Sequence, residues 1–341
     1  MKNKKSLVLT FLILFFSFSL VFAVDIKFKG LVQNWFSYAQ DNSNGDYSFG
    51  FTARRVRLKV VTKFSKKVIG VIQGSWDKQA TGLIDAYLDL KFKDEFNLRF
   101  GKFTVPASVS TSLTSSGKLD FVERSMFVLQ LAKLNGLAGF RTMGVQVSGK
   151  IFEKKAYYAF MVGNPETSKI FTPSVKSSTY SGEDSLFVGG RFELFPIKGL
   201  RIGSYATQSK VSSTDVKNTT YGAHFFYVIN GINFKAEYMK GKKEIMATDS
   251  TIDYNGFFLK FGYKLNKKIE ALIRYDVFTP KEDSFDTFGV ERYNNYSFGV
   301  NYQYCKYVKF QANYVIRDEK MAEGFAQLNN NIFYINIQYA F

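Results

Sequence analysis

The sequence contains very little cysteine, histidine, tryptophan or proline. Its 341 residues include one Cys, one His, two Trp and five Pro. A single cysteine, Cys305, excludes an internal disulfide framework and a cysteine-rich metal site. The sequence also has no cluster of metal-ligating residues and no glycine-rich phosphate-binding loop. We therefore expect neither a metal site nor a cofactor.

Long apolar runs are absent as well, except at the N-terminus. Lys2, Lys4 and Lys5 precede an apolar stretch over residues 7–22, and Ala23 follows it. This layout is typical of a secretory signal peptide, and the stretch is a little short for a membrane-spanning helix. We expect cleavage after Ala23, so that residues 1–23 form the signal peptide. A membrane anchor is the alternative, but no basic stop-transfer cluster follows the stretch.

The remaining domain, residues 24–341, is strongly basic. The whole chain has 46 Lys and Arg against 29 Asp and Glu, a formal charge of +17. The signal peptide contains three lysines, so the mature chain carries a charge of 17 − 3 = +14. A basic surface favours anionic partners. Nucleic acid is one such class, but we expect no nucleic-acid partner because an exported protein meets little of it.

Aromatic residues and segments of alternating polarity are abundant. There are 37 Phe and 21 Tyr. In residues 49–64, Arg55, Arg57 and Lys59 alternate with apolar side chains. A membrane strand turns its apolar side to lipid and its charges to a water-filled lumen. Arg54 has the parity of the lipid-facing side chains, so we expect it to snorkel to an interface.

Sixteen segments of about ten residues repeat this alternation, and a tilted strand of about 9–11 residues crosses a bilayer. They start near residues 25, 49, 67, 82, 96, 140, 155, 184, 200, 219, 232, 252, 268, 293, 306 and 331.

The connections between these segments alternate between short turns and longer polar loops. Asn230-Gly231 is typical of a two-residue hairpin turn, since both positions tolerate positive φ. Tight turns at one rim and longer loops at the other describe an outer-membrane barrel. The sequence therefore predicts an all-β fold, a transmembrane antiparallel β-barrel of 16 strands. A water-soluble β-sandwich is the alternative, but it has no reason to segregate its loops in this way.

One connection, residues 105–139, is much longer than its neighbours and is partly apolar. A long loop without strand pattern is usually functional or disordered. We expect this loop to fold into the lumen and narrow it; packing across the mouth or against a neighbouring subunit is the alternative. Its cationic residues, Lys118, Arg124 and Lys133, are the candidates for the constriction.

Short motifs occur in a particular order in the first half of the mature chain. They are Ala53-Arg54-Arg55-Val56-Arg57-Leu58, Asp85-Ala86-Tyr87-Leu88, Leu98-Arg99-Phe100-Gly101-Lys102-Phe103 with Val105-Pro106, Leu113-Thr114-Ser115-Ser116, Phe121-Val122-Glu123-Arg124-Ser125, Met143-Gly144-Val145-Gln146 and Gly149-Lys150. In this order and spacing they resemble the phosphate-selective porin O and P family. The second half of the chain is similar to the family only in its strand pattern.

The resemblance implies a trimeric sixteen-stranded barrel in the bacterial outer membrane, with a ladder of arginines and a ring of lysines in the lumen. Arg55, Arg57 and Arg99 match the ladder, and Lys59 is a candidate addition. Arg191 lies on the charged face of a later segment, and we include it in the predicted anion path. The lysine ring has no clear counterpart, which favours a general preference for anions over phosphate specificity.

The predicted function is an outer-membrane porin for passive diffusion of small anions, with phosphate and polyphosphate as candidate solutes. The expected partners are small anions, outer-membrane lipid and further copies of the chain in a homotrimer. One alternative is that the arginines pair with Asp85, Asp89 or Glu193 and only brace the wall. A second is a structural or adhesive barrel without solute selectivity. A phospholipase-type barrel would need His224 beside a serine, and we expect no enzymatic activity.

Overall fold

The structure is a computed structural model, and the predicted signal peptide, residues 1–23, lies outside its described residues. The residues that it describes are 24–40, 47–77, 82–108, 110, 114–135, 141–165, 186–211, 215–280, 289–326 and 329–341.

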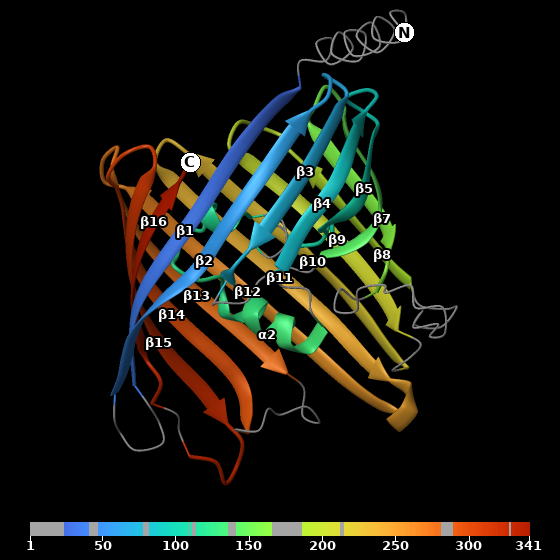
Figure 1. The fold of residues 1–341 in the computed structure, drawn as a ribbon. Helices are drawn as coiled ribbons and strands as arrows, with labels where there is room; N and C mark the ends of the chain where they lie inside the picture. The colour runs from blue at the N-terminus through green and yellow to red at the C-terminus, as the bar shows by residue number, and fades with distance from the viewer. Residues whose placement is uncertain are drawn as a thin grey trace, which may run out of the picture.

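These residues form one closed antiparallel sheet of sixteen strands (Figure 1). The strands are β1 (Asp25–Gln40), β2 (Tyr47–Lys63), β3 (Val68–Ser75), β4 (Gly82–Lys91), β5 (Asn97–Thr104), β6 (Arg141–Ile151), β7 (Ala156–Gly163), β8 (Leu186–Leu194), β9 (Leu200–Val211), β10 (Val216–Ile229), β11 (Ile232–Ile245), β12 (Ser250–Lys264), β13 (Ile269–Pro280), β14 (Val290–Gln303), β15 (Val308–Met321) and β16 (Ile332–Ala340). Each strand begins within three residues of its predicted start. The predicted sixteen-stranded all-β barrel is confirmed. The described helices are η3 (Ser116–Lys118), α2 (Met126–Asn135) and η4 (Met246–Thr248).

The first and last strands close the barrel. They pair antiparallel from Leu31 opposite Ala340 to Ala39 opposite Ile332. The Gly30 amide also donates to the Phe341 carbonyl at 2.9 Å. Closure gives each of the sixteen described strands a hydrogen-bonded neighbour on both sides. Lipid requires this, because it offers no hydrogen-bonding partner to the backbone.

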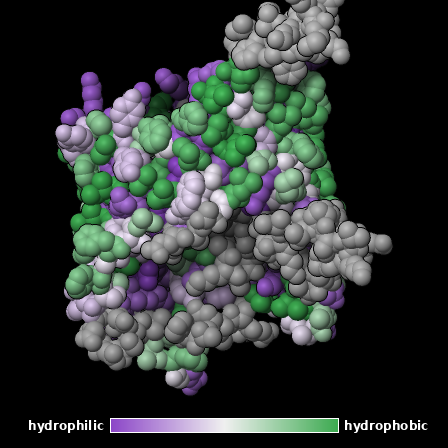
Figure 2. Space-filling model, viewed as in Figure 1, coloured by the Kyte–Doolittle hydropathy of each residue, from purple (hydrophilic) through white to green (hydrophobic). Residues whose placement is uncertain are grey.

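Alternating side chains separate an outer apolar face from an inner polar one. In β12, Leu259 and Phe261 are exposed on the outside, whereas Phe258 and Lys260 are buried on the inside. Figure 2 shows hydrophobic residues over much of the outer wall. No helix in the described residues is long and apolar enough to cross a membrane. At the predicted hairpin turn, Asn230 and Gly231 have φ values of 48° and 87°, which confirms that prediction.

A β-bulge corrects the prediction for Arg54. The pairing of β1 with β2 shifts there, so that Gln33 lies opposite Arg55 and Asn34 lies opposite Ala53. Arg54 is the extra residue. A bulge inserts one residue without a partner and re-aims its side chain. Arg54 therefore reaches into the lumen, where its Nη2 lies 2.8 Å from Glu123 Oε2, and the predicted snorkelling to a lipid interface is wrong.

The long connection between β5 and β6 contains α2, which packs on the inner side of β12 and β13 (Figure 1). Phe127 is fully buried there, and its ring stacks on Phe258 at a centroid distance of 5.8 Å. Met126 and Val128 are buried in the same cluster. The sequence analysis missed this helix. Ser125, a preferred residue type before the first turn of a helix, was the available signal.

We predict that charge on the two faces of β2 has unequal consequences. Leu58 is 40% exposed on the outer face, whereas Lys59 lines a cavity inside the barrel. Leu58→Arg should destabilise the barrel by ~2–4 kcal/mol if it lies near the bilayer midplane. Lys59→Gln should change the stability of the barrel little, because Lys59 lies in the water-filled lumen. Heat-modifiable gel mobility after refolding into vesicles measures both, and equal yields of folded barrel would contradict the assigned faces.

Candidate functional site

A cavity of about 940 Å³ lies between the long loop and the wall formed by β1 to β6. Nine cationic side chains and three carboxylates line it, an excess of six positive charges. The charged lining residues are Lys29, Arg54, Arg55, Arg57, Lys59, Arg99, Lys118, Arg124, Arg141, Asp77, Asp85 and Glu123. The structure thus brings Arg55, Arg57, Lys59 and Arg99 of the predicted anion path together with loop residues Lys118 and Arg124.

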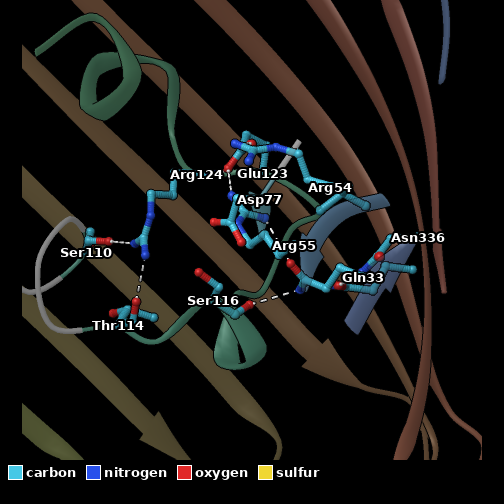
Figure 3. A network of polar contacts seen from close by, with 12 residues as sticks. Gln33, Arg54, Arg55, Asp77, Ser110, Thr114, Ser116, Glu123, Arg124 and Asn336 are labelled. Carbon is cyan, nitrogen blue, oxygen red and sulfur yellow. Dashed lines mark hydrogen bonds and ion pairs between the residues drawn. The ribbon is translucent and has the colours of Figure 1, made fainter. Parts of the chain in front are cut away.

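Glu123 joins the loop to the bulge of β2 (Figure 3). Its two carboxylate oxygens lie 2.6 Å from Arg55 Nη2 and 2.8 Å from Arg54 Nη2. Both guanidinium groups also lie within 6 Å of the Trp35 ring centre. Burial opposes ionisation of Glu123, but Arg55 and Arg54 outweigh it and hold the pKa of this carboxyl below its ordinary value. The carboxylate therefore stays charged and fixes the loop.

Arg57 connects the same wall to the loop and to the end of β3. Its Nε donates to Asp77 Oδ1 at 3.1 Å, and its Nη1 donates to Ser116 Oγ at 3.0 Å. Gln33 donates to the Ser116 carbonyl at 3.1 Å and accepts from Arg55 Nη1 at 2.9 Å. Burial raises the pKa of Asp77, but the hydrogen bonds from Arg57 and Ser75 and the nearby Arg57 charge together outweigh this effect and lower it. These contacts hold the start of the loop at η3 against β1 and β2.

Arg99 is paired with a carboxylate on its own wall. Its Nε and Nη2 donate to the two oxygens of Asp89 at 2.6 and 2.9 Å, and its guanidinium lies 4.1 Å from the Tyr87 ring centre. Arg141 Nε similarly donates to Asp85 at 2.8 Å. The pairing alternative from the sequence analysis therefore describes Arg99 correctly. The carboxylate partners of Arg55 and Arg57 were not predicted.

Three lysines in the cavity lining differ from these arginines. Lys29, Lys59 and Lys118 form no ion pair with any residue that the structure describes. The Lys59 ammonium lies 6.0 Å from the Tyr87 ring centre, and Lys118 is exposed at the end of η3. These ammonium groups present positive charge to the cavity, and no described carboxylate neutralises that charge in an ion pair.

Arg124 supports the loop itself. Its two terminal nitrogens donate to the carbonyl oxygens of Ser110 and Thr114 at 2.5 and 2.9 Å (Figure 3). Burial lowers the pKa of Arg124 to about 10, and the nearby Arg55 charge adds to this effect. It remains protonated at neutral pH. Lys133 was also predicted at the constriction, but its side chain is not among those that the structure describes.

Arg191 is not part of the cavity lining. It is buried on β8, and its Nε lies 3.2 Å from Glu193 Oε2. Arg201 Nε and His224 Nε2 contact the same carboxylate at 2.6 and 3.1 Å. Glu193, one of the carboxylates named in the pairing alternative, therefore braces this part of the wall through Arg191, Arg201 and His224. His224, which the phospholipase alternative required, is buried in this cluster.

A second set of contacts holds the loop to the opposite wall. Asp120 lies 2.6 Å from Lys235 Nζ, 3.1 Å from Lys260 Nζ and 3.1 Å from Asn233 Nδ2. We call these contacts the Asp120 tether. Burial opposes ionisation, but Lys260 and Lys235 outweigh it and lower the pKa of Asp120 to about 2. Gln311 adds one hydrogen bond to the backbone carbonyl of Asp120, at 3.0 Å. Sequence reasoning missed this tether, and no local motif indicated it.

Comparison with known proteins extends the resemblance to nearly the whole chain. Residues 26–341 match the family described as phosphate-selective porin O and P. The protein belongs to this family. Membership in the phosphate-selective porin O and P family confirms the predicted location in the bacterial outer membrane and indicates a channel rather than an enzyme. No curated protein matches the sequence significantly.

Solved porin structures share the fold at low sequence identity. An anion-selective porin from Comamonas acidovorans has a TM-score of 0.72 at 14% identity, covering 93% of this chain and 100% of that one. The trimer form of in-vitro folded OmpT, an outer membrane protein of Vibrio cholerae, has a TM-score of 0.67 at 14% identity, with 94% and 100% covered. The outer membrane channel DcaP of Acinetobacter baumannii has a TM-score of 0.62 at 14% identity, with 93% and 97% covered.

Among the described residues, no group of His, Cys, Asp and Glu side chains could hold a metal ion.

We predict that the Asp120 tether contributes strongly to stability. Asp120→Asn would leave Lys260, which is only 2% exposed, without its carboxylate. Removal of one partner of a buried pair costs roughly 3–5 kcal/mol. Asp94→Asn is the matched control, because Asp94 pairs with Lys154 at 2.9 Å between two turns, with both side chains exposed. Denaturant unfolding in detergent should show a large loss for the first variant and no measurable change for the second.

The same tether gives a pH dependence with a defined sign. The pKa of Asp120 is about 2 in the folded protein, against an ordinary value of 3.8. A lowered carboxyl pKa stabilises the folded state fully above the unfolded value and less as the pH falls towards the folded one. The tether contribution should thus be constant from pH ~7 to pH ~5 and decline below pH ~4. A loss between pH ~7 and pH ~5 in the wild type but not in Asp120→Asn would contradict this assignment.

Proposed function

We propose that the protein is a porin that conducts small anions through the cavity between β1 to β6 and the long loop. The excess of six positive charges around that cavity is the observation that carries the proposal. An attractive wall raises the local concentration of anions and lowers that of cations. Sixteen strands enclose an aqueous channel rather than a packed core. The family assignment supports the same function.

The paired arginines and the unpaired lysines have different parts in this proposal. Asp89 already occupies the fork of Arg99, so a passing oxyanion must compete with it for those donors. Lys29, Lys59 and Lys118 have no such competitor among the described residues. A unit charge pair at 4 Å is worth about 4 kcal/mol at an effective dielectric of 20 and ~1 kcal/mol in water. Several shallow sites of this kind allow anions to enter and also to leave.

Phosphate and polyphosphate are candidate solutes within this class. The donors of a guanidinium group suit two phosphate oxygens. In this barrel the arginine donors are largely engaged by Asp77, Asp89 and Glu123, which favours selection by charge over recognition of phosphate geometry. Phosphate added to a chloride solution distinguishes the two: strong block of chloride current indicates a phosphate site, and simple additivity indicates charge selection.

We predict that Lys59→Glu weakens anion selectivity. The change reduces the excess charge of the cavity from six to four and removes no ion pair with a described residue. The ratio of anion to cation permeability should fall about fivefold, the equivalent of ~1 kcal/mol. Lys198→Glu is the control, because Lys198 is exposed on the turn between β8 and β9, does not line the cavity and forms no ion pair with a described residue. Reversal potentials in a potassium chloride gradient measure the ratio.

Unchanged selectivity in Lys59→Glu would contradict the proposed path, because Lys59 would then not face the permeating ions. A folded wild-type barrel without any conductance would instead favour the structural or adhesive alternative.

We also propose that the chain assembles as a homotrimer. Strands β3, β4 and β5 are short and expose Ile72, Leu83 and Phe100 on the outside at 60%, 50% and 61%. Large exposed apolar patches mark contacts with protein or lipid. We predict that cross-linking in mild detergent yields a trimer and that Phe100→Lys reduces it, with Phe261→Lys on the far wall as the control. Detection of monomer alone would overturn this proposal.

A further inference from the structure

The turns at the short-turn rim carry a concentration of lysines that the channel does not use. These turns are residues 64–67, 92–96, 152–155, 195–199, 230–231, 265–268 and 304–307. Nine lysines on them are exposed, and we call this set the basic collar: Lys66, Lys67, Lys93, Lys154, Lys155, Lys198, Lys267, Lys268 and Lys306. The same turns contain three acidic residues, so the collar carries six excess positive charges. Figure 2 shows hydrophilic residues projecting at this upper rim.

Three of the turns repeat one arrangement of residues. An apolar residue is followed, after one position, by two lysines in residues 64–67, 152–155 and 265–268. Phe64, Phe152 and Leu265 are 52%, 70% and 63% exposed. The repeat places an exposed apolar side chain beside two exposed ammonium groups at separate points around the rim.

Local hydrogen bonds fix two of these turns in the same way. Ser65 Oγ accepts from the backbone amides of Lys67 and Val68, both at 3.1 Å. Asn266 Oδ1 accepts from the amides of Lys268 and Ile269 at 2.8 and 2.9 Å. Such side-chain to backbone bonds stabilise a turn. The second lysine in residues 64–67 and in residues 265–268 is thereby held at the base of its following strand, exposed at the rim.

The connections at the opposite rim have a net negative charge. Apart from the long loop in the lumen, they contain twelve acidic residues and four lysines. The turns and loops of the two rims therefore differ in the sign of their net charge. Short turns face the periplasm in outer-membrane barrels. The basic collar thus lies at the periplasmic leaflet, whose phospholipid headgroups are its immediate neighbours.

We propose that the basic collar binds anionic phospholipid headgroups and concentrates such lipids around the periplasmic rim. Lysine stems can lie along apolar surface while their ammonium groups reach the headgroups. Aromatic and large apolar residues at the same level hold the rim at the interface. Attraction to an anionic surface amounts to about fivefold in affinity per lysine near that surface. This interaction is separate from solute selection, because no collar lysine lines the cavity.

The test compares retained lipids in three folded variants and the wild type. Each protein is purified from vesicles of equimolar phosphatidylglycerol and phosphatidylcholine, and native mass spectrometry measures the ratio of the lipids that remain bound. The collar variant is Lys155→Gln, Lys198→Gln and Lys268→Gln together. None of these three lysines forms an ion pair within the described chain. One control replaces the same lysines by arginine. The other is Lys240→Gln, Lys242→Gln and Lys320→Gln near the long-loop rim, where Lys242 and Lys320 pair with Glu244 and Glu291.

The wild type should retain phosphatidylglycerol preferentially, and the collar variant should lose this preference by about threefold or more. The arginine control should keep it, because the charge is preserved, and the long-loop control should keep most of it. The wild-type preference should also decline in high salt. Equal preference in all four proteins, or no effect of salt, would overturn the proposal. Single Lys268→Gln serves if the triple variant fails to fold, which heat-modifiable gel mobility reveals.

Peptidoglycan is another anionic structure on this side of the membrane. Loss of co-sedimentation with purified peptidoglycan in the collar variant, together with an unchanged lipid ratio, would assign the collar to peptidoglycan and overturn the lipid proposal.

Discussion

The need to pair every backbone amide and carbonyl inside lipid is the constraint on which the rest of this structure depends. It requires β1 to meet β16 and leaves the strands only one arrangement, a closed ring. Outer side chains must then be apolar, so the charges of the alternating strands gather inside. The long connection between β5 and β6 packs on this inner, charged surface. Closure therefore creates both the charged lumen and the anchors that hold the loop.

Charge compensation decides how those anchors work. A carboxylate taken out of water is tolerated only beside cations and hydrogen-bond donors. Glu123 meets this requirement between Arg54 and Arg55, and Asp120 meets it between Lys235 and Lys260. The loop thus crosses the lumen with one carboxylate fixed at each wall. After these pairs are formed, more cations than carboxylates still face the cavity, and this residual charge is what a permeating ion meets.

The strands could be predicted from the sequence because each one has a local signal. Alternation with period two sets the face of a side chain, and turn residues set the ends, so every start was found within three residues. The bulge at Arg54 was missed because one inserted residue reverses parity without any change in composition. The inward face of Arg55, Arg57 and Lys59 was predicted for the same local reason, whereas Arg99 was assigned to the anion path from the family resemblance; all four line the cavity.

The ion-pair partners could not be predicted, because they are brought together by closure and not by spacing. Asp120 and Lys260 are 140 residues apart in the chain. The alternation indicates that Lys260 faces inward but not which loop residue lies opposite it. Arg191 shows the same limit. The alternation correctly predicted that its side chain points inward, but it did not predict that Arg191 pairs with Glu193 outside the cavity lining. A family resemblance adds little to the prediction of ion-pair partners, because matching motifs identify the type of a residue but not the residue that it contacts.

The position of the cavity on one side of the barrel follows from the two chemistries of the loop. Its helix α2 places Met126, Phe127 and Val128 against Phe258 and other apolar side chains of the inner wall, where water is excluded. The preceding segment, with Ser116 and Lys118, is polar and faces β1 and β2. The cavity between the loop and the opposite wall therefore measures only about 50 Å³, whereas the larger cavity, of about 940 Å³, lies on the polar side. In that narrowed space a lysine such as Lys59 acts in a lower effective dielectric than it would in a wide channel, so each unpaired charge has a larger influence on passing anions.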